Sequence, residues 1–351
     1  MSKEVKRVIP FDDILAALLD DNRSFPPAFL HRFSDLNPTD FAKLKTVWGQ
    51  VSPARRVALV EDLEILAETN TLVSFDDLCV FCLDDSEPGV RIAALRYLWE
   101  SEDVSLVARL IHLLENDPVD LVRAAAASTL GKFVYLGELE EIPPSVLLTI
   151  EEKLLGAASD DQPPLIRRRA IESLGYSSRK EVKHLIQSAY NHDDPQWQCT
   201  ALFAMGRSAN EEYIPTVVDQ LDNPNLDVQF EAVRAAGELS ASQAREPLLE
   251  MLAENADDGD LRMAVIWSLS QIGGEEVRET LETLLEETDD DEQVEFIQEA
   301  LDNLYLTEGL SSFEMFDFDS QDEDDLRSVV NLEDKSEDEE EDNSQDNHHL
   351  K

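Results

Sequence analysis

The sequence has little cysteine, and it contains no long uncharged apolar run. Its 351 residues include only Cys79, Cys82 and Cys199, a small odd number that argues against a disulfide framework and for a reducing compartment. No stretch of about 18 uncharged apolar residues occurs, which argues against a transmembrane helix. The apolar stretch at residues 14–19 is bracketed by aspartates and lacks the pattern of a secretory signal. These absences predict a soluble, cytoplasmic protein.

Basic residues are also scarce. The chain has 29 lysines and arginines against 76 aspartates and glutamates, which gives a net charge of -47. Such a field repels nucleic-acid phosphates and anionic lipid headgroups, so neither nucleic acid nor a membrane surface is an expected partner. Basic or amphipathic protein segments are the partners that this charge favours, unless the acidity serves solubility alone.

Motifs that carry catalysis or bind cofactors are missing. There is no glycine-rich phosphate loop, no dinucleotide fingerprint and no nucleophile elbow. Cys79 and Cys82 form a C-x-x-C in an apolar segment, but no second Cys/His pair lies at zinc spacing, which favours core packing. The Asp-rich turns do not match the calcium-loop pattern. The sequence therefore predicts no enzyme, no cofactor and no metal.

What the sequence does contain is a repeat. Seven times, an Asp/Asn-rich turn precedes an anchor residue, which is often followed by Arg and then by a segment rich in small and apolar residues. The anchors are 31 to 33 residues apart, except for one spacing of 44 that contains an insertion at residues 133–145. Apolar or small residues recur at +4, +8 and often +11, which is helical periodicity with one apolar face. The anchors are Val90, Val122, Ile166, Trp197, Val228, Leu261 and Gln293.

A further apolar segment precedes each anchored one, so each repeat reads as helix, turn, helix. One such hairpin cannot bury its apolar face alone, whereas a stack of hairpins can. The pattern predicts an all-α, right-handed superhelix over residues 74–306. Residues 1–73 carry three Pro-led segments and are predicted to form an N-terminal helical cap, with the region around Trp48 as an alternative partner-specific module.

The repeat resembles a known family. The motif D-P-x-x-x-V-R-x-A-A-A-x-x-L-G, clearest at residues 117–131, is similar to the short HEAT-like repeat of phycobilin lyase subunits and many bacterial scaffold proteins. The resemblance implies a HEAT-like solenoid but little about activity, because many functions share one fold. Deoxyhypusine hydroxylases, which are also HEAT-like, build an iron site from His-Glu pairs, and no histidine here is followed by Glu.

Position +1 from the anchor bears on how the repeats are joined. The resemblance implies a ladder in which an Arg at +1 binds turn aspartates of neighbouring repeats. The ladder is predicted to lapse where Gln replaces Arg, which would make the middle repeats easier to flex. The +1 residues are Arg91, Arg123, Arg167, Gln198, Gln229, Arg262 and Val294.

Positions +2 and +6 depart from the family pattern in the later copies. By resemblance these positions are charged and face a groove, but copies four to six carry mainly apolar residues there. Aromatic, Met and Arg side chains are enriched at interfaces, so we predict a partner-binding groove anchored by Phe203, Phe230 and Trp267. The alternative is that neighbouring helices bury these residues. The predicted groove residues are Cys199, Phe203, Phe230, Arg234, Met263 and Trp267.

Beyond residue 306 the repeat pattern stops. Residues 307–351 contain acidic blocks with few apolar residues, a composition that predicts disorder. The segment FEMFDF interrupts the charge and is interpreted as a linear interaction motif, as a cap on the last repeat, or as an occupant of the chain's own groove. Its apolar residues are Phe313, Met315, Phe316 and Phe318.

Together these features predict a non-catalytic scaffold or adaptor that binds a protein partner in the groove. An enzyme accessory or bilin-lyase-like subunit is one alternative, and an acidic chaperone that shields basic proteins is another. A coloured preparation would favour the first alternative. Salt-sensitive capture of basic proteins would favour the second.

Overall fold

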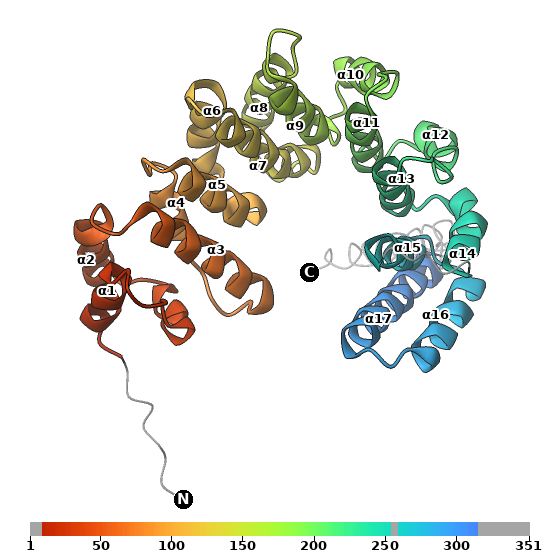
Figure 1. Cartoon of the computed structure of the whole chain (residues 1–351). Helices are drawn as coiled ribbons and strands as arrows, with labels where there is room; N and C mark the ends of the chain where they lie inside the picture. The colour runs from red at the N-terminus through yellow and green to blue at the C-terminus, as the bar shows by residue number, and fades with distance from the viewer. Residues whose placement is uncertain (1–8, 254–258, 315–351) are drawn as a thin grey trace, which may run out of the picture. The chain divides into compact units, whose positions relative to one another are not determined.

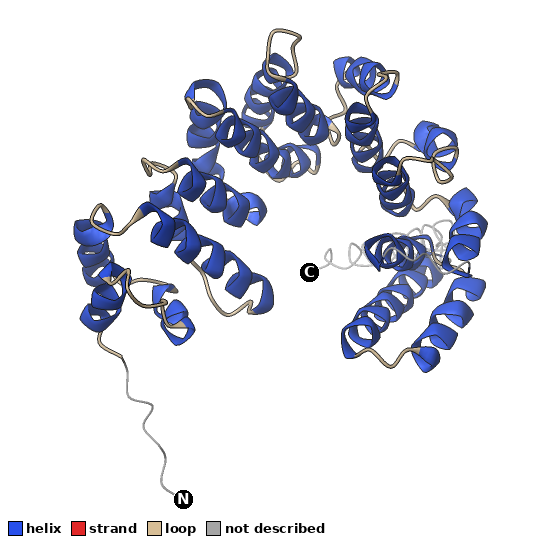
Figure 2. Ribbon diagram, viewed as in Figure 1, coloured by secondary structure: helices blue, strands red, loops and turns tan. Residues whose placement is uncertain are grey.

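The computed structural model describes residues 9–253 and 259–314, and every regular element in these two ranges is a helix (Figure 2). No strand is formed within them. The prediction of an all-α fold is therefore confirmed. The chain divides into a larger unit 1, residues 1–272, and a smaller unit 2, residues 273–351.

Unit 1 begins with a small group of helices that docks on the first repeat through Trp48. The indole Nε1 of Trp48 donates a hydrogen bond of 2.6 Å to Oδ2 of Asp85, and the ring packs against Phe81 with centroids 5.9 Å apart. Trp48 is buried and therefore has a structural role within the chain. The helices of this group are α1 (Phe11–Leu19), the 3-10 helix η1 (Pro27–Phe33), α2 (Pro38–Trp48) and α3 (Pro53–Thr69).

Six helical hairpins follow in unit 1. Most of their anchor residues are fully buried, as the repeat pattern predicts, and Trp197 and Leu261 are buried to more than nine-tenths. In order, the hairpins pair α4 (Asp76–Cys82) with α5 (Pro88–Tyr97), α6 (Val107–Asn116) with α7 (Asp120–Glu138), α8 (Pro144–Ala157) with α9 (Pro164–Leu174), α10 (Lys180–Tyr190) with α11 (Pro195–Arg207), α12 (Ile214–Val218) with α13 (Leu226–Glu238), and α14 (Arg245–Ala253) with α15 (Gly259–Ile272). Short 3-10 turns join some of them: η2 (Leu98–Glu100), η3 (Val104–Leu106), η4 (Glu211–Tyr213) and η5 (Ser242–Ala244).

The hairpins of unit 1 form two layers (Figure 1). The second helices, α5, α7, α9, α11, α13 and α15, contact one another in chain order, and α3 contacts α5 at the start of the same row. The first helices, α4, α6, α8, α10, α12 and α14, form the other layer and chiefly contact their own partners. We call the layer made by α3 and the second helices the second-helix row.

Glycines near the ends of the second helices allow the row to pack closely. A Cβ atom on Gly175 would lie 2.9 Å from the Cα of Ala204 on α11, and one on Gly237 would lie 2.8 Å from the Cα of Ser268 on α15. Both distances are shorter than a carbon–carbon contact allows, and the obstructing atoms belong to the backbone. The Gly that ends many copies of the repeat is therefore a packing residue.

The predicted ladder is present in the first repeats. Arg56 lies 3.1 Å from the carboxylate of Asp85, and Arg91 lies 2.8 Å from that of Asp117, with all four side chains more than nine-tenths buried. It lapses at the glutamines, as predicted, but it already ends before them: Arg123 reaches Gln162 in the next turn, and the carboxylate beside Arg167 is Asp160 of its own turn. Within the described residues, Gln198 reaches only the carbonyl of His192. Gln229 likewise reaches only the carbonyl of Leu221.

The insertion at residues 133–145 lengthens a helix. α7 continues without a break to Glu138, and the chain then reverses through Glu140, whose φ of 61° lies in the left-handed region. Phe133, Val134 and Leu136 are buried by this extension. The added residues therefore contribute core to the stack.

Unit 2 is one hairpin, α16 (Glu275–Glu287) packed on α17 (Asp291–Glu314). Its buried side chains include Val277 and Leu281 on α16 and Leu301 and Leu304 on α17. The predicted boundary at residues 306–307 lies inside α17, because no proline interrupts the chain between Leu304 and Glu314. Phe313 lies on this helix, whereas Met315, Phe316, Phe318 and the rest of the predicted acidic tail lie outside the described residues.

Candidate functional site

The six predicted groove residues lie on three neighbouring helices of the second-helix row. α11 carries Cys199 and Phe203, α13 carries Phe230 and Arg234, and α15 carries Met263 and Trp267. These helices contact one another in order, so the +2 and +6 positions form one continuous strip. Each of the six residues is half-buried. The strip as a binding groove stays a prediction.

Part of the rings of Phe203 and Trp267 in the strip is used within the chain. The guanidinium of Arg207 lies 4.0 Å from the ring centroid of Phe203, and that of Arg234 lies 5.8 Å from the same centroid. The ring of Trp267 covers Gly237 closely enough that a Cβ there would lie 2.8 Å from Cζ3 of the indole. Only the remaining surface of these rings is open to a partner.

A network of carboxylates and arginines lies beside the strip. Arg169 pairs with Glu172, which also accepts a hydrogen bond of 2.9 Å from Thr200, and Arg234 lies 3.5 Å from Glu238. Oε2 of Glu231 is buried and has no hydrogen-bond partner in the described part of the chain.

Burial shifts the titration of two groups in this area. Loss of hydration raises the pKa of Glu231 from its ordinary 4.5 to about 7, because the charged form is disfavoured more by burial than it is helped by Arg234. Burial and the nearby Glu231 raise the pKa of the Cys199 thiol to about 12. Cys199 is therefore an unreactive thiol at neutral pH.

A larger hollow lies at the other end of the second-helix row, over α7. Its volume is about 470 Å³, and its floor is made by Ala124, Ala125 and Ser128 of α7. Because these side chains are small, the neighbouring helices α5 and α9 form its walls while α7 leaves the middle open. The large apolar side chains around it are Ile92, Leu95, Trp99, Leu121 and Leu165.

The apolar rim of this hollow is open to solvent. Leu121 is 59% exposed and Trp99 is 42% exposed, and both lie together on the lining of this hollow. Glu64 and Glu68 of α3 line one side, and Arg96 is held by Glu64 at 2.8 Å. The hollow therefore combines an apolar bottom with an edge that carries both acidic and basic side chains, because Arg169 also lines it.

Sequence analysis missed this hollow. The second and third copies carry small or polar residues at +2 and +6, whereas the predicted groove lies where these positions hold large residues. The signal was the run of alanines in α7 beside Leu121 and Leu165, both one residue before an anchor. A hollow forms where the side chains of neighbouring helices leave space between them. The residue pattern of one helix does not show this.

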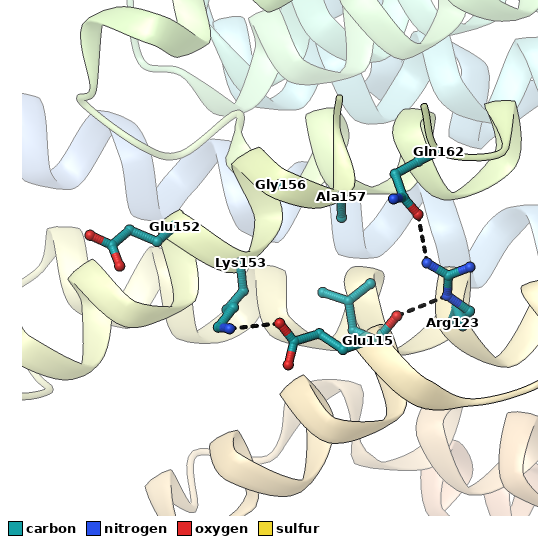
Figure 3. A pocket seen from close by; sticks show the side chains of 8 residues that line it. Glu115, Arg123, Glu152, Lys153, Gly156, Ala157 and Gln162 are labelled. Atoms are coloured by element: carbon teal, nitrogen blue, oxygen red, sulfur yellow. Dashed lines mark hydrogen bonds and ion pairs between the residues drawn. The ribbon is translucent and has the colours of Figure 1, made fainter. Parts of the chain in front are cut away.

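A polar hollow of about 420 Å³ lies on the other layer, where α6 and α8 meet the start of α7 (Figure 3). Three of its charged groups already have partners. Lys153 lies 2.6 Å from Glu115, and Arg123 donates to the carbonyl of Leu114 at 2.9 Å and to Gln162 at 2.6 Å. A ligand here would have to displace these contacts, so the hollow is a weaker candidate.

The two cysteines of the C-x-x-C are core residues, as predicted. Cys79 and Cys82 on α4 are fully buried, and burial raises the pKa of both thiols. Among residues 9–253 and 259–314, no three His, Cys, Asp or Glu side chains are placed to hold a metal ion together. None of the helices in these ranges has the length and apolar character needed to cross a membrane.

Comparison with solved structures finds similar chains at low identity. The CpcE–CpcF complex of phycocyanin lyase from Nostoc is 17% identical over 81% of this chain and 97% of that chain, with a TM-score of 0.49. The Escherichia coli protein YibA is 17% identical over 81% and 97%, with a TM-score of 0.41. Human deoxyhypusine hydroxylase is 17% identical over 75% and 95%, with a TM-score of 0.32.

Comparison at the level of sequence gives the family. No protein with a curated description matches this chain. The family model for HEAT repeats matches residues 74–144, 151–228 and 214–302, which together are more than half of the sequence. The matched ranges include the hairpins of unit 1 whose anchors are buried. The chain belongs to the HEAT repeat family.

Proposed function

We propose that this chain is a non-catalytic scaffold that binds an amphipathic, basic segment of a partner protein on the second-helix row. The observation that carries the proposal is the open apolar hollow over α7. A monomeric surface seldom leaves Leu121 and Trp99 exposed around a cavity unless another molecule covers them. Each large side chain that a partner fully buries there contributes roughly 1.5–3 kcal/mol.

Charge supports a basic partner. Glu64 and Glu68 stand at the edge of the hollow, and the whole chain has a net charge of -47. Arg96 adds little positive potential because Glu61 and Glu64 both lie within ion-pair distance of it. An amphipathic segment with lysines or arginines beside its apolar face would meet apolar surface at the bottom and carboxylates at the rim.

The experiment uses a labelled peptide of leucine and lysine about 18 residues long, roughly 27 Å as a helix, with its leucines on one face. Binding to the full chain is followed by fluorescence anisotropy. We expect it to bind at least about tenfold more tightly than a peptide of the same composition whose leucines are spread around the helix. Equal binding of the two peptides would show a purely electrostatic attraction and would contradict the proposal.

A pair of matched variants locates the site. Leu121→Glu places a charge in the hollow and should weaken binding of the amphipathic peptide by about tenfold or more. Leu148→Glu on α8 is the control, because Leu148 is 51% exposed on the other layer and the substitution adds the same charge. If both variants weaken binding equally, the hollow is not the site.

The strip on α11, α13 and α15 is the second proposed contact zone. Phe230→Ala and Trp267→Ala should each weaken binding of a partner that spans the row, with little change in the free energy of unfolding. A loss of about 3 kcal/mol or more in unfolding free energy would instead show that neighbouring helices use these rings as core. Urea unfolding of the two variants distinguishes the outcomes.

A further inference from the structure

A second, smaller hollow lies at the carboxyl ends of the second helices. Its volume is about 200 Å³. It is bounded by η2, by the later turns of α7, by the residue that follows Gly175 after α9, and by the last residue of α11. The lining residues are Trp99, Glu100, Lys132, Tyr135, Tyr176 and Arg207.

Arg207 is a largely buried cation without a carboxylate partner. Its guanidinium lies 4.0 Å from the ring centroid of Phe203 and 4.9 Å from that of Tyr176. Among the described residues, its one hydrogen bond goes to the carbonyl of Glu172, at the long distance of 3.5 Å. No carboxylate of these residues lies within 4.0 Å of the guanidinium; Glu238 acts on it from farther away and lies 3.5 Å from Arg234.

The surroundings make this arrangement costly for the empty protein. Burial lowers the pKa of Arg207, because removal of water disfavours the charged form more than the distant carboxylates favour it. Aromatic rings attract the flat faces of a guanidinium but do not satisfy the N–H groups at its edge. Those edge donors match the two oxygens of a carboxylate.

The rest of the hollow suits a flat apolar group next to that carboxylate. Tyr135 and Tyr176 pack with ring centroids 5.1 Å apart and form one wall, and Trp99 forms another. Lys132 provides a second positive charge, held 3.3 Å from Glu102, whose side chain is 66% exposed and easily displaced. Glu100 repels an anion from its side of the hollow. The favoured place for the ligand's carboxylate is therefore between Arg207 and Lys132.

We propose that this hollow binds a carboxylate carried by an aromatic body, with Arg207 as the principal ligand and Lys132 as the second. A free aromatic acid and an aromatic residue next to a carboxylate in a peptide share this chemistry. The site differs from the proposed scaffold site in its chemistry, because it requires an anion where the larger hollow favours cations; Trp99 lines both hollows, and Arg207 packs on Phe203 of the strip.

The test uses N-acetylphenylalanine and its uncharged amide as probes of the full chain, with binding measured by saturation-transfer NMR. We expect the acid to bind at least about tenfold more tightly than the amide. Arg207→Gln should weaken binding of the acid by about tenfold and leave the weak binding of the amide unchanged. Arg168→Gln on α9 is the control, because Arg168 does not line the hollow, and it should leave both affinities unchanged.

Two further measurements keep the result decisive. Lys132→Gln removes the second cation of the hollow and should weaken binding of the acid by a smaller factor. This variant keeps the test valid even if Arg207→Gln perturbs the fold. An acetylated Glu-Phe-amide peptide tests the carboxylate within a chain, and binding of either acid supports the site. Failure of both acids, or displacement of N-acetylphenylalanine by an equal concentration of inorganic phosphate, would overturn the carboxylate assignment.

Discussion

The early and late repeats of unit 1 are joined differently, although they share one fold. Between the early repeats, Arg56 binds Asp85 and Arg91 binds Asp117 as buried ion pairs that connect successive repeats. Later in the row, Gln198 stands at the position of Arg91, and it reaches only a turn carbonyl. The early repeats are thus linked by charge, whereas the later ones depend on helix packing.

The acceptor side of the ladder changes with the donor side. Five residues before the anchor, the early repeats have Asp85 and Asp117, and the later ones have His192 and Asn223. All four accept a backbone N–H two residues ahead, at 2.7, 2.9, 3.0 and 2.9 Å. The turn therefore needs a hydrogen-bond acceptor at this position. The ion pair between repeats additionally needs that acceptor to be a negatively charged carboxylate.

Removing a ladder arginine should have the largest effect on stability and should show the difference between early and late repeats most clearly. Arg91→Met leaves Asp117 as a buried charge without its partner, so the free energy of unfolding should fall by about 3–5 kcal/mol. Gln198→Met, the matched change in a late repeat, removes only a hydrogen bond to a carbonyl and should cost about 1 kcal/mol. Urea unfolding measures both, and equal losses would show that the ladder does not distinguish the two regions.

Close helix packing is the link that both regions share. Gly237→Ala forces a Cβ against the backbone of α15, so we expect a loss of about 1–3 kcal/mol in the free energy of unfolding. Gly156→Ala is the control, because nothing lies within 4 Å of a Cβ there, and within α8 it should stabilise by up to about 1 kcal/mol. Loss of stability in both variants would point to a general intolerance of substitution.

The late region also carries a buried group that titrates near neutrality. The folded pKa of Glu231 is about 7, above its ordinary 4.5, so the folded state holds the proton more tightly and stability falls as pH rises between these values. Glu231→Gln should therefore stabilise the protein by about 1–2 kcal/mol near pH 8 and have little effect near pH 4 to 5. Unfolding measured across pH tests this, and a pH-independent difference would contradict it.

The smallest expected effect is that of restoring the ladder in the late repeats. Gln198→Arg combined with Asn223→Asp recreates a donor and an acceptor at the positions of Arg91 and Asp117. Because a new buried pair must overcome desolvation, the net change in unfolding free energy should stay within about 1 kcal/mol. A double-mutant cycle should still give a favourable coupling between the two substitutions, and zero coupling would show that the late turns are too far apart for the pair.

Much of the fold could be predicted because its signals are local or periodic. The buried anchors and the helix-turn-helix repeat follow from residues at fixed spacing, since helix geometry alone places them on one face. The ladder at Arg91 follows from the family resemblance. The pair of Arg56 with Asp85 was not predicted, because Arg56 lies in the N-terminal cap, outside the seven repeats from which the ladder was expected. The 3-10 character of η1 and the lengthening of α7 also depend on packing against neighbours.

What the sequence determined by itself is the class of the protein: an acidic HEAT repeat chain with a periodic core and with no motif for catalysis. What only the tertiary structure decided is where that chain is open. The alanines of α7 leave a hollow between larger side chains of α5 and α9, and Arg207 has no carboxylate within ion-pair distance among the described residues, whereas Arg234 lies 3.5 Å from Glu238. Both features are relations between side chains on different helices, which are set by three-dimensional packing and not by any spacing along the chain.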